Sequence, residues 1–505
     1  MKRYICALLS VIITFSLFSC EKNTITDTSS EEESREVSEE PEPVIYTIVY
    51  FHTYADEAQA LADAVREASG LEFPIVKYSN GYTLPDNSIV IGKINDGIAE
   101  TLTEGMNRRD FMIKSVGGSL YFCSNGKDTV KTAVEYFIDN LITARGVELG
   151  GDFSYHFDYP YPLEGAAING VFIGDFNIIY ASTENEAKYS DVASLFKGYL
   201  DENADAVISS YPENTAQGEN EIIIGLADGR ELVGNYRERD FAFNAYKIII
   251  SGTKVAVVGN NACAVYNGCM ALMDYIASSD GRNATDTEID GTCTLVKVAC
   301  VGDSITKGAN SAYPNIQNYP AYLQQMLGYN YYVKNFGIDG YSLINTDYYA
   351  YNKTAEYTAS KAFKPDVVLF ILGTNDCNPG QEYKDWTNPE REVKYKESAK
   401  LFFDSYYVVN ENAQIFMGIP STLFYSTIWP WEEWAARIVA HAMPLNLEIA
   451  EENSLPIIDM YTWSLENSSV FTDGLHPCDA SYKRYAQRVY NEIIETIISP
   501  EDLEQ

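Results

Sequence analysis

The sequence predicts an α/β protein in which a doubly wound parallel sheet follows two smaller, repeated α/β units. The C-terminal part alternates short, continuous apolar runs with helical segments, which is typical of strands buried on both faces and covered by helices. The part before it contains two similar successions of strand and helix signals. A chain of 505 residues also exceeds one ordinary core and favours about three folded units.

The composition is that of a soluble globular protein, with 46% hydrophobic and 21% charged residues, enough to build a sizeable core. The 36 Lys and Arg stand against 72 Asp and Glu, for a formal net charge of -36. Such a charge repels phosphate backbones and anionic lipid surfaces. We therefore expect no nucleic-acid partner, and membrane association only through a lipid anchor.

The first 20 residues have the pattern of an export signal. Basic residues at Lys2 and Arg3 precede an apolar stretch from about Ile5 to Phe18, and a small residue precedes Cys20. The segment resembles a bacterial lipoprotein signal, in which Cys20 becomes the lipidated first residue. An uncleaved transmembrane anchor is the alternative, but the run is shorter than the ~20 residues that span a bilayer. We expect an exported protein, anchored by lipid to the bacterial cell envelope and facing outside.

Residues 21–44 are rich in Glu, Ser and Thr and poor in apolar side chains, which predicts a disordered acidic linker. Beyond Cys20 the chain has seven scattered cysteines with no CxxC pair. This set predicts neither a disulfide framework nor a zinc site. No HExxH motif, paired histidines or carboxylate cluster argues for a metal, and we expect no cofactor.

The repeated units are assigned to residues 45–163 and 164–292. The stretch NSIVIG at 87–92 is echoed by NEIIIG at 220–225, and the triplet RDF occurs after each. Both copies continue with a strand, a Gly turn, a second strand and an amphipathic helix, and both open with a strand and a helix. The helices that end the copies are expected at about Lys127 to Leu141 and Asn261 to Ile276.

This unit resembles the non-catalytic α/β domain that precedes catalytic domains in several glycoside hydrolases, including α-glucuronidases and hexosaminidases. We assign no chemistry to it, because His52 and His156 stand alone in the sequence.

Residues 293–500 contain five apolar runs that predict a doubly wound, flavodoxin-like parallel sheet with its ligand site at the carboxyl ends of the strands. The runs are Leu295 to Val301, Tyr331 to Phe336, Val367 to Leu372, Ile415 to Ile419 and Pro456 to Ile458. Helices are expected at about Tyr319 to Leu327, Glu397 to Val409, Trp431 to Glu451 and Ala480 to Ile498.

Four polar motifs fall at this predicted edge. They are GDS at 302–304, NFGIDG at 335–340, GTND at 373–376 and DGLHP at 473–477. In order and in structural context they are similar to the four blocks of the SGNH (GDSL) hydrolase superfamily. Taken alone, a residue such as Asn375 is as well explained as a loop cap.

The resemblance implies a serine esterase with Ser304 as nucleophile, His476 as base and Asp473 as the group that orients the imidazole. It also implies an oxyanion hole formed by the backbone N–H groups of Ser304 and Gly340 and the side-chain amide of Asn375. We interpret Gly337 as part of the strand-end turn and leave Asp303 and Asp376 as structural, the latter as a helix N-cap. His441 is expected to pack or to face solvent.

The aromatic residues of this part suggest a substrate. All five Trp lie here, and Trp429 and Trp431 follow the fourth strand, where they are candidates to stack on sugar rings or to form a hydrophobic plug or lid hinge. Our leading hypothesis is removal of O-acetyl groups from extracellular carbohydrate. The alternatives are a lipase, thioesterase or arylesterase on small acyl esters, and a surface glycan-binding lipoprotein with a decayed esterase, which the four intact motifs disfavour.

We predict that Cys20→Ser prevents lipidation, because no thiol remains to carry the acyl chains. Cell fractionation with immunoblotting should then show loss of the mature protein from the membrane fraction, whereas Cys6→Ser should leave it there. An unprocessed Cys20→Ser protein that stays with the membrane would identify the segment as a simple anchor.

Overall fold

The computed structural model describes residues 42–503 apart from residues 150, 183–187 and 429. The predicted signal with Cys20, nearly all of the predicted linker, and Trp429 therefore lie outside the described residues. The chain divides into two compact units, Met1–Asp158 and Tyr159–Gln505. Within the described residues, no helix combines the length and apolar character needed to cross a membrane.

The first unit is built on a six-stranded sheet of order β2-β1-β3-β5-β4-β6. The strands are β1 (Thr47–Tyr50), β2 (Ile75–Lys77), β3 (Ser88–Ile91), β4 (Phe111–Val116), β5 (Ser119–Ser124) and β6 (Ser154–Phe157). Strands β4 and β6 run antiparallel to their neighbours, and the other pairs are parallel. Helices α1 (Ala55–Ser69) and α3 (Lys127–Leu141) bury their apolar sides in one core, whereas α2 (Ile98–Leu102) packs against a smaller cluster.

The second unit begins with a sheet of order β10-β9-β11-β13-β12-β15, the same arrangement of positions and directions as in the first sheet. Its strands are β9 (Asn177–Tyr180), β10 (Ser209–Pro212), β11 (Glu221–Ile224), β12 (Ala245–Ser251), β13 (Lys254–Gly259) and β15 (Thr287–Thr292). Helices α4 (Tyr189–Asn203) and α5 (Ala262–Ser278) contribute to its core. Three short strands, β7 (Ala167–Ile168), β8 (Val171–Phe172) and β14 (Asn283–Ala284), form a separate small sheet.

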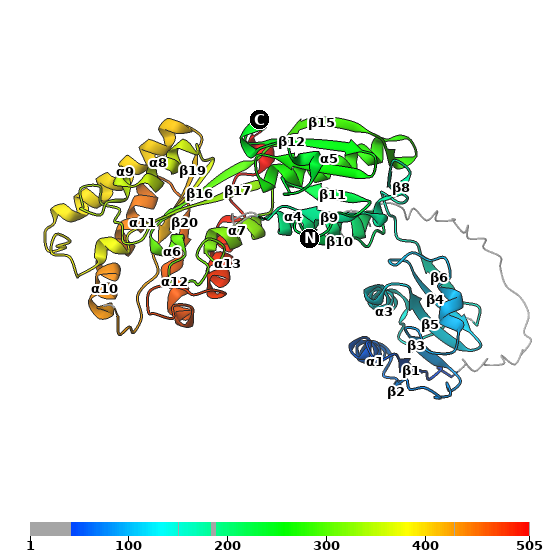
Figure 1. Ribbon diagram of the computed structural model, residues 1–505. Helices are drawn as coiled ribbons and strands as arrows, with labels where there is room; N and C mark the ends of the chain where they lie inside the picture. Colours follow the sequence, from blue (N-terminus) through cyan, green and yellow to red (C-terminus); the bar gives the residue numbers. More distant parts are fainter. Residues whose placement is uncertain (1–41, 150, 183–187, 429, 504–505) are drawn as a thin grey trace, which may run out of the picture. The chain divides into compact units, whose positions relative to one another are not determined.

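The same unit contains a five-stranded parallel sheet of order β17-β16-β18-β19-β20 (Figure 1). Its strands are β16 (Val296–Gly302), β17 (Tyr331–Gly337), β18 (Val367–Ile371), β19 (Gln414–Ile419) and β20 (Ile457–Asp459). The helices around it are α6 (Ser304–Lys307), α7 (Tyr319–Leu327), α8 (Ala355–Ala362), α9 (Glu390–Val409), α10 (Trp431–Arg437), α11 (Met443–Glu452), α12 (Met460–Glu466) and α13 (Ser481–Ile493).

Alternate side chains of these strands enter two cores on opposite faces of the sheet. Along β18, Leu369 joins the cluster of α7 and α13, whereas Val368 and Phe370 join that of α9 and α11. Burial on both faces explains why the strands read as continuous apolar runs. The predicted fold class, α/β with a doubly wound parallel sheet, is confirmed.

The two sheets of the second unit share an interface through α5. The rings of Tyr266 and Tyr329 lie 5.2 Å apart, and the Cys263 thiol lies 3.3 Å from the Tyr331 carbonyl oxygen. The ring of Phe243 meets that of Tyr332 edge to face at 5.0 Å. Tyr329, just before β17, is therefore buried, and the first residues of β17 are partly covered by the preceding sheet and its helix α5.

The helix expected at Trp431 to Glu451 is confirmed, with one irregularity: a π-helical turn at Ile438–Ala442 joins α10 to α11. Pro444 stands in the first turn of α11 and cannot donate to the carbonyl one turn earlier, so the helix loosens there. The remaining short turns are 3-10 helices at Ile173–Asp175, Glu231–Val233, Glu238–Asp240, Asp280–Arg282, Tyr351–Lys353, Asn375–Cys377, Ser468–Val470 and Pro500–Leu503.

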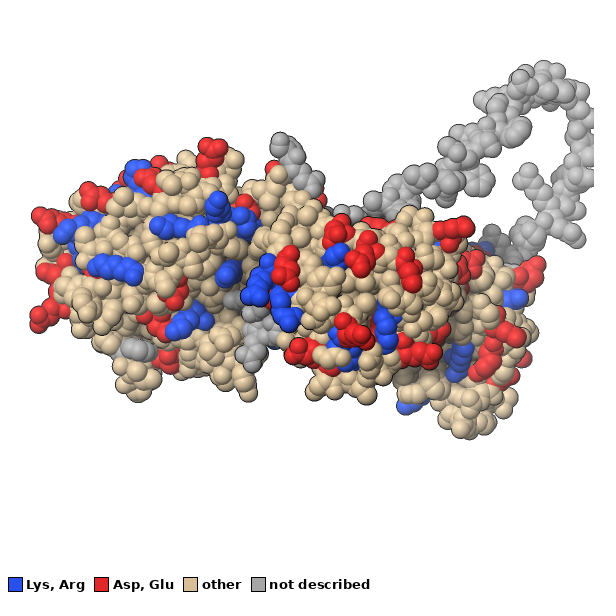
Figure 2. Space-filling view, turned by 45° about the horizontal axis from the view of Figure 1, so that its top comes forward, with Lys and Arg blue, Asp and Glu red and all other residues tan. Residues whose placement is uncertain are grey.

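Acidic and basic side chains are interspersed on the face seen in Figure 2. Figure 2 shows Asp and Glu side chains in scattered groups with Lys and Arg side chains between them.

Candidate active site

Three strand ends come together because their pairing is parallel and in register. Gly302, the last residue of β16, lies opposite Gly337 at the end of β17 and Ile371 at the end of β18. The carboxyl ends of neighbouring parallel strands open onto one crevice. The motifs that follow these strands therefore meet at one edge.

Ser304, His476 and Asp473 form a continuous chain of polar contacts. Ser304 Oγ lies 2.8 Å from His476 Nε2, and His476 Nδ1 lies 2.8 Å from Asp473 Oδ2. The other carboxylate oxygen, Oδ1, accepts the backbone N–H groups of Leu475 at 2.8 Å and His476 at 2.7 Å. One tight turn thus positions the imidazole and its carboxylate partner together.

The electrostatics of this turn determine the direction of the hydrogen bonds. Burial raises the pKa of Asp473, but hydrogen bonds from the His476 side chain and from two backbone N–H groups outweigh it and lower this pKa to about 2. The carboxylate is therefore ionised at neutral pH and can only accept. His476 Nδ1 donates to it, and Nε2 is then the acceptor for the Ser304 hydroxyl proton.

Two glycines allow the short helix α6 to carry Ser304 close to the strands. A Cβ on Gly302 would lie 2.0 Å from Thr306 Oγ1, and one on Gly337 would lie 2.2 Å from the Lys307 backbone nitrogen. Neither contact is sterically possible, so both positions require glycine. Asp303 caps the helix by accepting the Ile305 N–H at 3.0 Å.

The three expected oxyanion donors stand at the ends of β16, β17 and β18. The backbone N–H groups of Ser304 and Gly340 donate to no protein acceptor within the described part of the chain. Gly340 occupies an exposed turn with φ of 80°, a left-handed conformation that favours glycine. Asn375 donates one side-chain N–H to Asp303 Oδ2 at 3.4 Å, and an amide has a second N–H to offer.

Asp303 therefore does more than cap a helix, because its carboxyl group also orients the Asn375 amide. Burial raises the pKa of Asp303 to about 6, against the opposing effect of its hydrogen bonds and of His476. This carboxyl is fully buried between the nucleophile and the third motif.

Three side chains from two other segments, the loop before α9 and helix α10, hold the Asn375 loop by its carbonyl oxygens. Lys384 Nζ donates to the Asn375 carbonyl at 2.6 Å. The Trp434 indole donates to the Thr374 carbonyl at 2.7 Å, and the Trp386 indole to the Asp376 carbonyl at 3.0 Å. Burial lowers the pKa of Lys384, an effect that Asp376 opposes.

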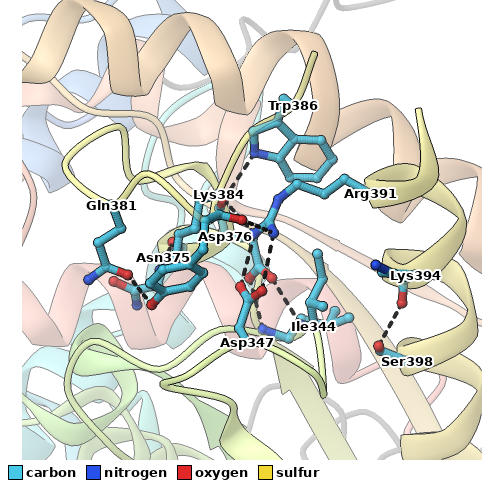
Figure 3. A network of polar contacts seen from close by, with 12 residues as sticks. Ile344, Asp347, Asn375, Asp376, Gln381, Lys384, Trp386, Arg391, Lys394 and Ser398 are labelled. Atoms are coloured by element: carbon cyan, nitrogen blue, oxygen red, sulfur yellow. Dashed lines mark hydrogen bonds and ion pairs between the residues drawn. The ribbon is translucent and has the colours of Figure 1, made fainter. Parts of the chain in front are cut away.

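Asp376 joins the second and third motifs (Figure 3). Its carboxylate accepts the backbone N–H groups of Leu343 at 2.8 Å and Ile344 at 2.9 Å. The interpretation of Asp376 as a helix N-cap is wrong, since its acceptors serve the loop that follows Gly340. The sequence offered no local signal for this tie or for Lys384, because the partners lie on separate loops.

The segment after β19 is locked to the histidine turn. The Phe424 N–H donates to the Gly474 carbonyl at 2.8 Å, and the Ser426 hydroxyl to the Asp473 carbonyl at 2.7 Å. This places Tyr425, which is 74% exposed, beside the candidate base. Trp431 is half-buried, with its ring 6.2 Å from that of Tyr425, and Trp429 lies outside the described residues.

The remaining histidines differ in their surroundings. The expectation that His156 stands alone is wrong, because its Nε2 lies 3.3 Å from Asp158 Oδ1. With Asp110 these residues place three possible ligand atoms within 4.8 Å of one another, on an edge that is largely exposed. His441 stacks on Trp386 with ring centroids 4.4 Å apart, in agreement with a packing role.

Comparison with known proteins identifies a domain in the C-terminal part of the chain. Residues 300–484 match the model of the GDSL-like lipase/acylhydrolase family, which confirms the resemblance of this part. An acetylxylan esterase of Xylanibacter ruminicola is 30% identical over 210 residues, equal to 38% of this chain and 42% of that protein. The chain thus spans less than half the length of this relative.

Solved structures with similarity include a carbohydrate acetylesterase family member from Sinorhizobium meliloti, with 20% identity and a TM-score of 0.32 over 40% of this chain and 98% of that one. An aryl esterase of M. smegmatis has 15% identity and a TM-score of 0.31 over 40% of this chain and all of its own.

The low pKa of Asp473 predicts a pH-dependent contribution to stability. Its folded pKa of about 2 lies below the ordinary value of 3.8, so the stabilisation is present above about pH 4 and is lost as the pH falls through 2. The difference corresponds to roughly 2 kcal/mol. Asp473→Asn should lower the free energy of unfolding by about this amount at pH 7 and by about half of it at pH 3, measured by chemical denaturation. A difference that is the same at both pH values would contradict the assigned pKa.

Proposed function

Because residues 300–484 match the GDSL-like lipase/acylhydrolase family, we propose that the protein is a serine carboxylic ester hydrolase. The observation that carries this proposal is the chain from Ser304 Oγ to His476 Nε2 and from His476 Nδ1 to Asp473, with 2.8 Å at each step. An isolated serine hydroxyl is a weak nucleophile at neutral pH, and an adjacent oriented base is what activates it.

In the proposed reaction, Ser304 Oγ attacks the ester carbonyl carbon while its proton passes to His476 Nε2. Asp473 stays ionised and stabilises the imidazolium. Collapse of the tetrahedral intermediate breaks the bond to the alcohol, which takes the proton from His476 and leaves an acyl group on Ser304. Water then attacks the acyl carbon and gives a proton to His476 Nε2. Collapse of the second intermediate breaks the bond to Ser304 Oγ, which takes that proton back, and releases the carboxylic acid.

The negative charge of each tetrahedral intermediate needs donors that are fixed before the reaction. The N–H groups of Ser304 and Gly340 and the free N–H of Asn375 are suited to this role, because no protein acceptor among the described residues occupies the first two. Their positions are set by strand ends and by the carbonyl contacts of the Asn375 loop, so little reorganisation is required.

We propose that the substrate is an O-acetyl group on carbohydrate outside the cell. The relative from Xylanibacter ruminicola carries the name acetylxylan esterase, and the exposed ring of Tyr425 lies next to the histidine turn. An aromatic face beside the ester site suits the apolar face of a sugar ring. The sequence of the first 20 residues supports export with a lipid anchor at Cys20, as part of the same proposal.

We predict that Ser304→Ala or His476→Ala lowers kcat by about 10⁴ to 10⁶, because the members of such a triad act as a unit. Asn375→Ala should lower kcat by about 10² to 10³ with little change in KM, as expected for a donor that engages only the oxyanion. The assay is p-nitrophenyl acetate hydrolysis, with Ser405→Ala on α9 as a control. Near-normal turnover by Ser304→Ala would refute the mechanism.

We also predict a preference for short acyl groups. A polar site for sugar esters gives little apolar contact to a longer chain, whereas in a lipase-like pocket each buried methylene contributes about 0.8 kcal/mol. The values of kcat/KM should fall from p-nitrophenyl acetate through butyrate to octanoate, and acetylated xylan should release acetate. A preference for octanoate with no acetate release from glycans would favour the lipase alternative.

A further inference from the structure

A cavity lies among the loops that follow the second and third motifs, and no part of the proposed catalytic chemistry uses it. It measures about 580 Å³ and is lined by Tyr348, Tyr383, Asp347 and residues of α9 that include Arg391 and Lys394. Its rim carries two exposed rings, since Tyr348 is 74% and Tyr383 43% exposed. Rings exposed to this extent contribute little to the core and are available to contact a ligand.

The Tyr348 side of the cavity leads directly to the oxyanion donor Gly340. The ring of Tyr348 meets that of Tyr349 edge to face at 4.7 Å, and Tyr349 meets Tyr341 in the same way at 5.8 Å. Tyr341 is the residue after Gly340. The Ser342 N–H donates to the Tyr349 carbonyl at 2.7 Å, which fixes the row of rings to the second motif.

The Tyr383 segment of the lining is bonded to the loop of the other donor, Asn375. Tyr383 precedes Lys384, whose ammonium group holds the Asn375 carbonyl at 2.6 Å. The floor contains the buried pair Arg391 and Asp347, with side-chain exposures of 7% and 5%. Arg391 also donates to the Asp376 carbonyl at 3.3 Å. Hydrogen bonds and an ion pair thus connect the Arg391–Asp347 pair in the floor to the loop that carries Asn375 (Figure 3).

The chemistry of the lining favours a ligand that is rich in hydroxyl groups. Beside the two rings, the lining includes exposed donors and acceptors, among them Lys394, Asp385 and Asn388. An apolar acyl chain would leave these groups without partners after losing their water. A sugar ring offers both an apolar face for a tyrosine and hydroxyl groups for the polar side chains.

We infer that this cavity is a sugar-binding subsite that holds a neighbouring residue of the acetylated glycan while its ester lies at Ser304. The inference rests on the proposed function for the identity of the chain, but the binding itself needs no catalysis. The subsite makes the enzyme prefer oligomers to single acetylated sugars. A sugar bound in the subsite would also contact the residues whose hydrogen bonds position the Asn375 loop.

The direct test measures binding by the full-length Ser304→Ala protein, titrated calorimetrically with unacetylated xylohexaose. Tyr348→Ala in this background should weaken binding by about 3- to 10-fold, the size expected for an aromatic contact, and Lys394→Ala should weaken it less. Tyr407→Ala and Lys400→Ala are matched controls on α9 outside the cavity, and both should bind normally. Thermal denaturation of each variant verifies folding.

The kinetic test uses the active protein with single substitutions. Tyr348→Ala should raise KM for acetylated xylo-oligosaccharides by a similar factor and leave kcat/KM for p-nitrophenyl acetate within about 2-fold, because the small ester does not reach the cavity. An equal loss on both substrates would mark Tyr348 as merely structural and overturn the inference.

The outcomes separate the two proposals. Absence of xylohexaose binding, or binding that Tyr348→Ala does not weaken, overturns the subsite even if ester hydrolysis is found. Conversely, if xylohexaose binding depends on Tyr348 but the protein with Ser304 intact hydrolyses no ester, the subsite is supported and the proposed function is refuted. If Tyr348→Ala does not fold, Lys394→Ala decides, since its exposed side chain carries little of the core.

Discussion

The parallel pairing of β16 with β17 and β18 is the constraint on which the site depends. It aligns Gly302 with Gly337 and Ile371, so that three consecutive loops leave the sheet at one level. A shift of one residue in this register would turn every following side chain to the other face. The apolar clusters on both faces of the sheet resist such a shift, and the stability of the core thereby fixes the geometry of the loops.

Buried charge connects these loops at a thermodynamic cost. Lys384, Arg391, Asp347 and Asp376 are all nearly inaccessible to solvent, and removing charged groups from water is unfavourable unless they are paired and hydrogen-bonded. Here two cations and two carboxylates lie together, and most of their polar atoms meet backbone groups. An arrangement of this kind contributes less to stability than an apolar core, but it permits few alternative loop conformations.

The five strands of the parallel sheet, and the site residues in the loops after them, could be predicted from the sequence alone. Three motifs stand directly after buried apolar runs, and the fourth lies beyond the fifth run and before the last helix. Ser304, Gly340, Asn375 and His476 could therefore be assigned to one edge before any distance was known. Contacts such as Asp376 to Leu343 or Lys384 to Asn375 could not be predicted, because they join irregular loops that have no periodic pattern. The short strands β2 and β10 were missed for the related reason that three or four residues at a sheet edge give little signal.

The attachment of the Tyr425 segment to the histidine turn affects how selectivity is expressed. Gly474 has φ of 88°, and a Cβ there would lie 2.8 Å from both the Phe424 and the Tyr425 carbonyl oxygens. The two segments are therefore packed against each other so closely that only glycine fits at position 474. A ligand that displaced Tyr425 would also displace the turn that carries the imidazole, so that binding and proton transfer would be coupled. Substrates that contact Tyr425 differently would then differ mainly in kcat, and the dissociation constant alone would not identify the preferred substrate.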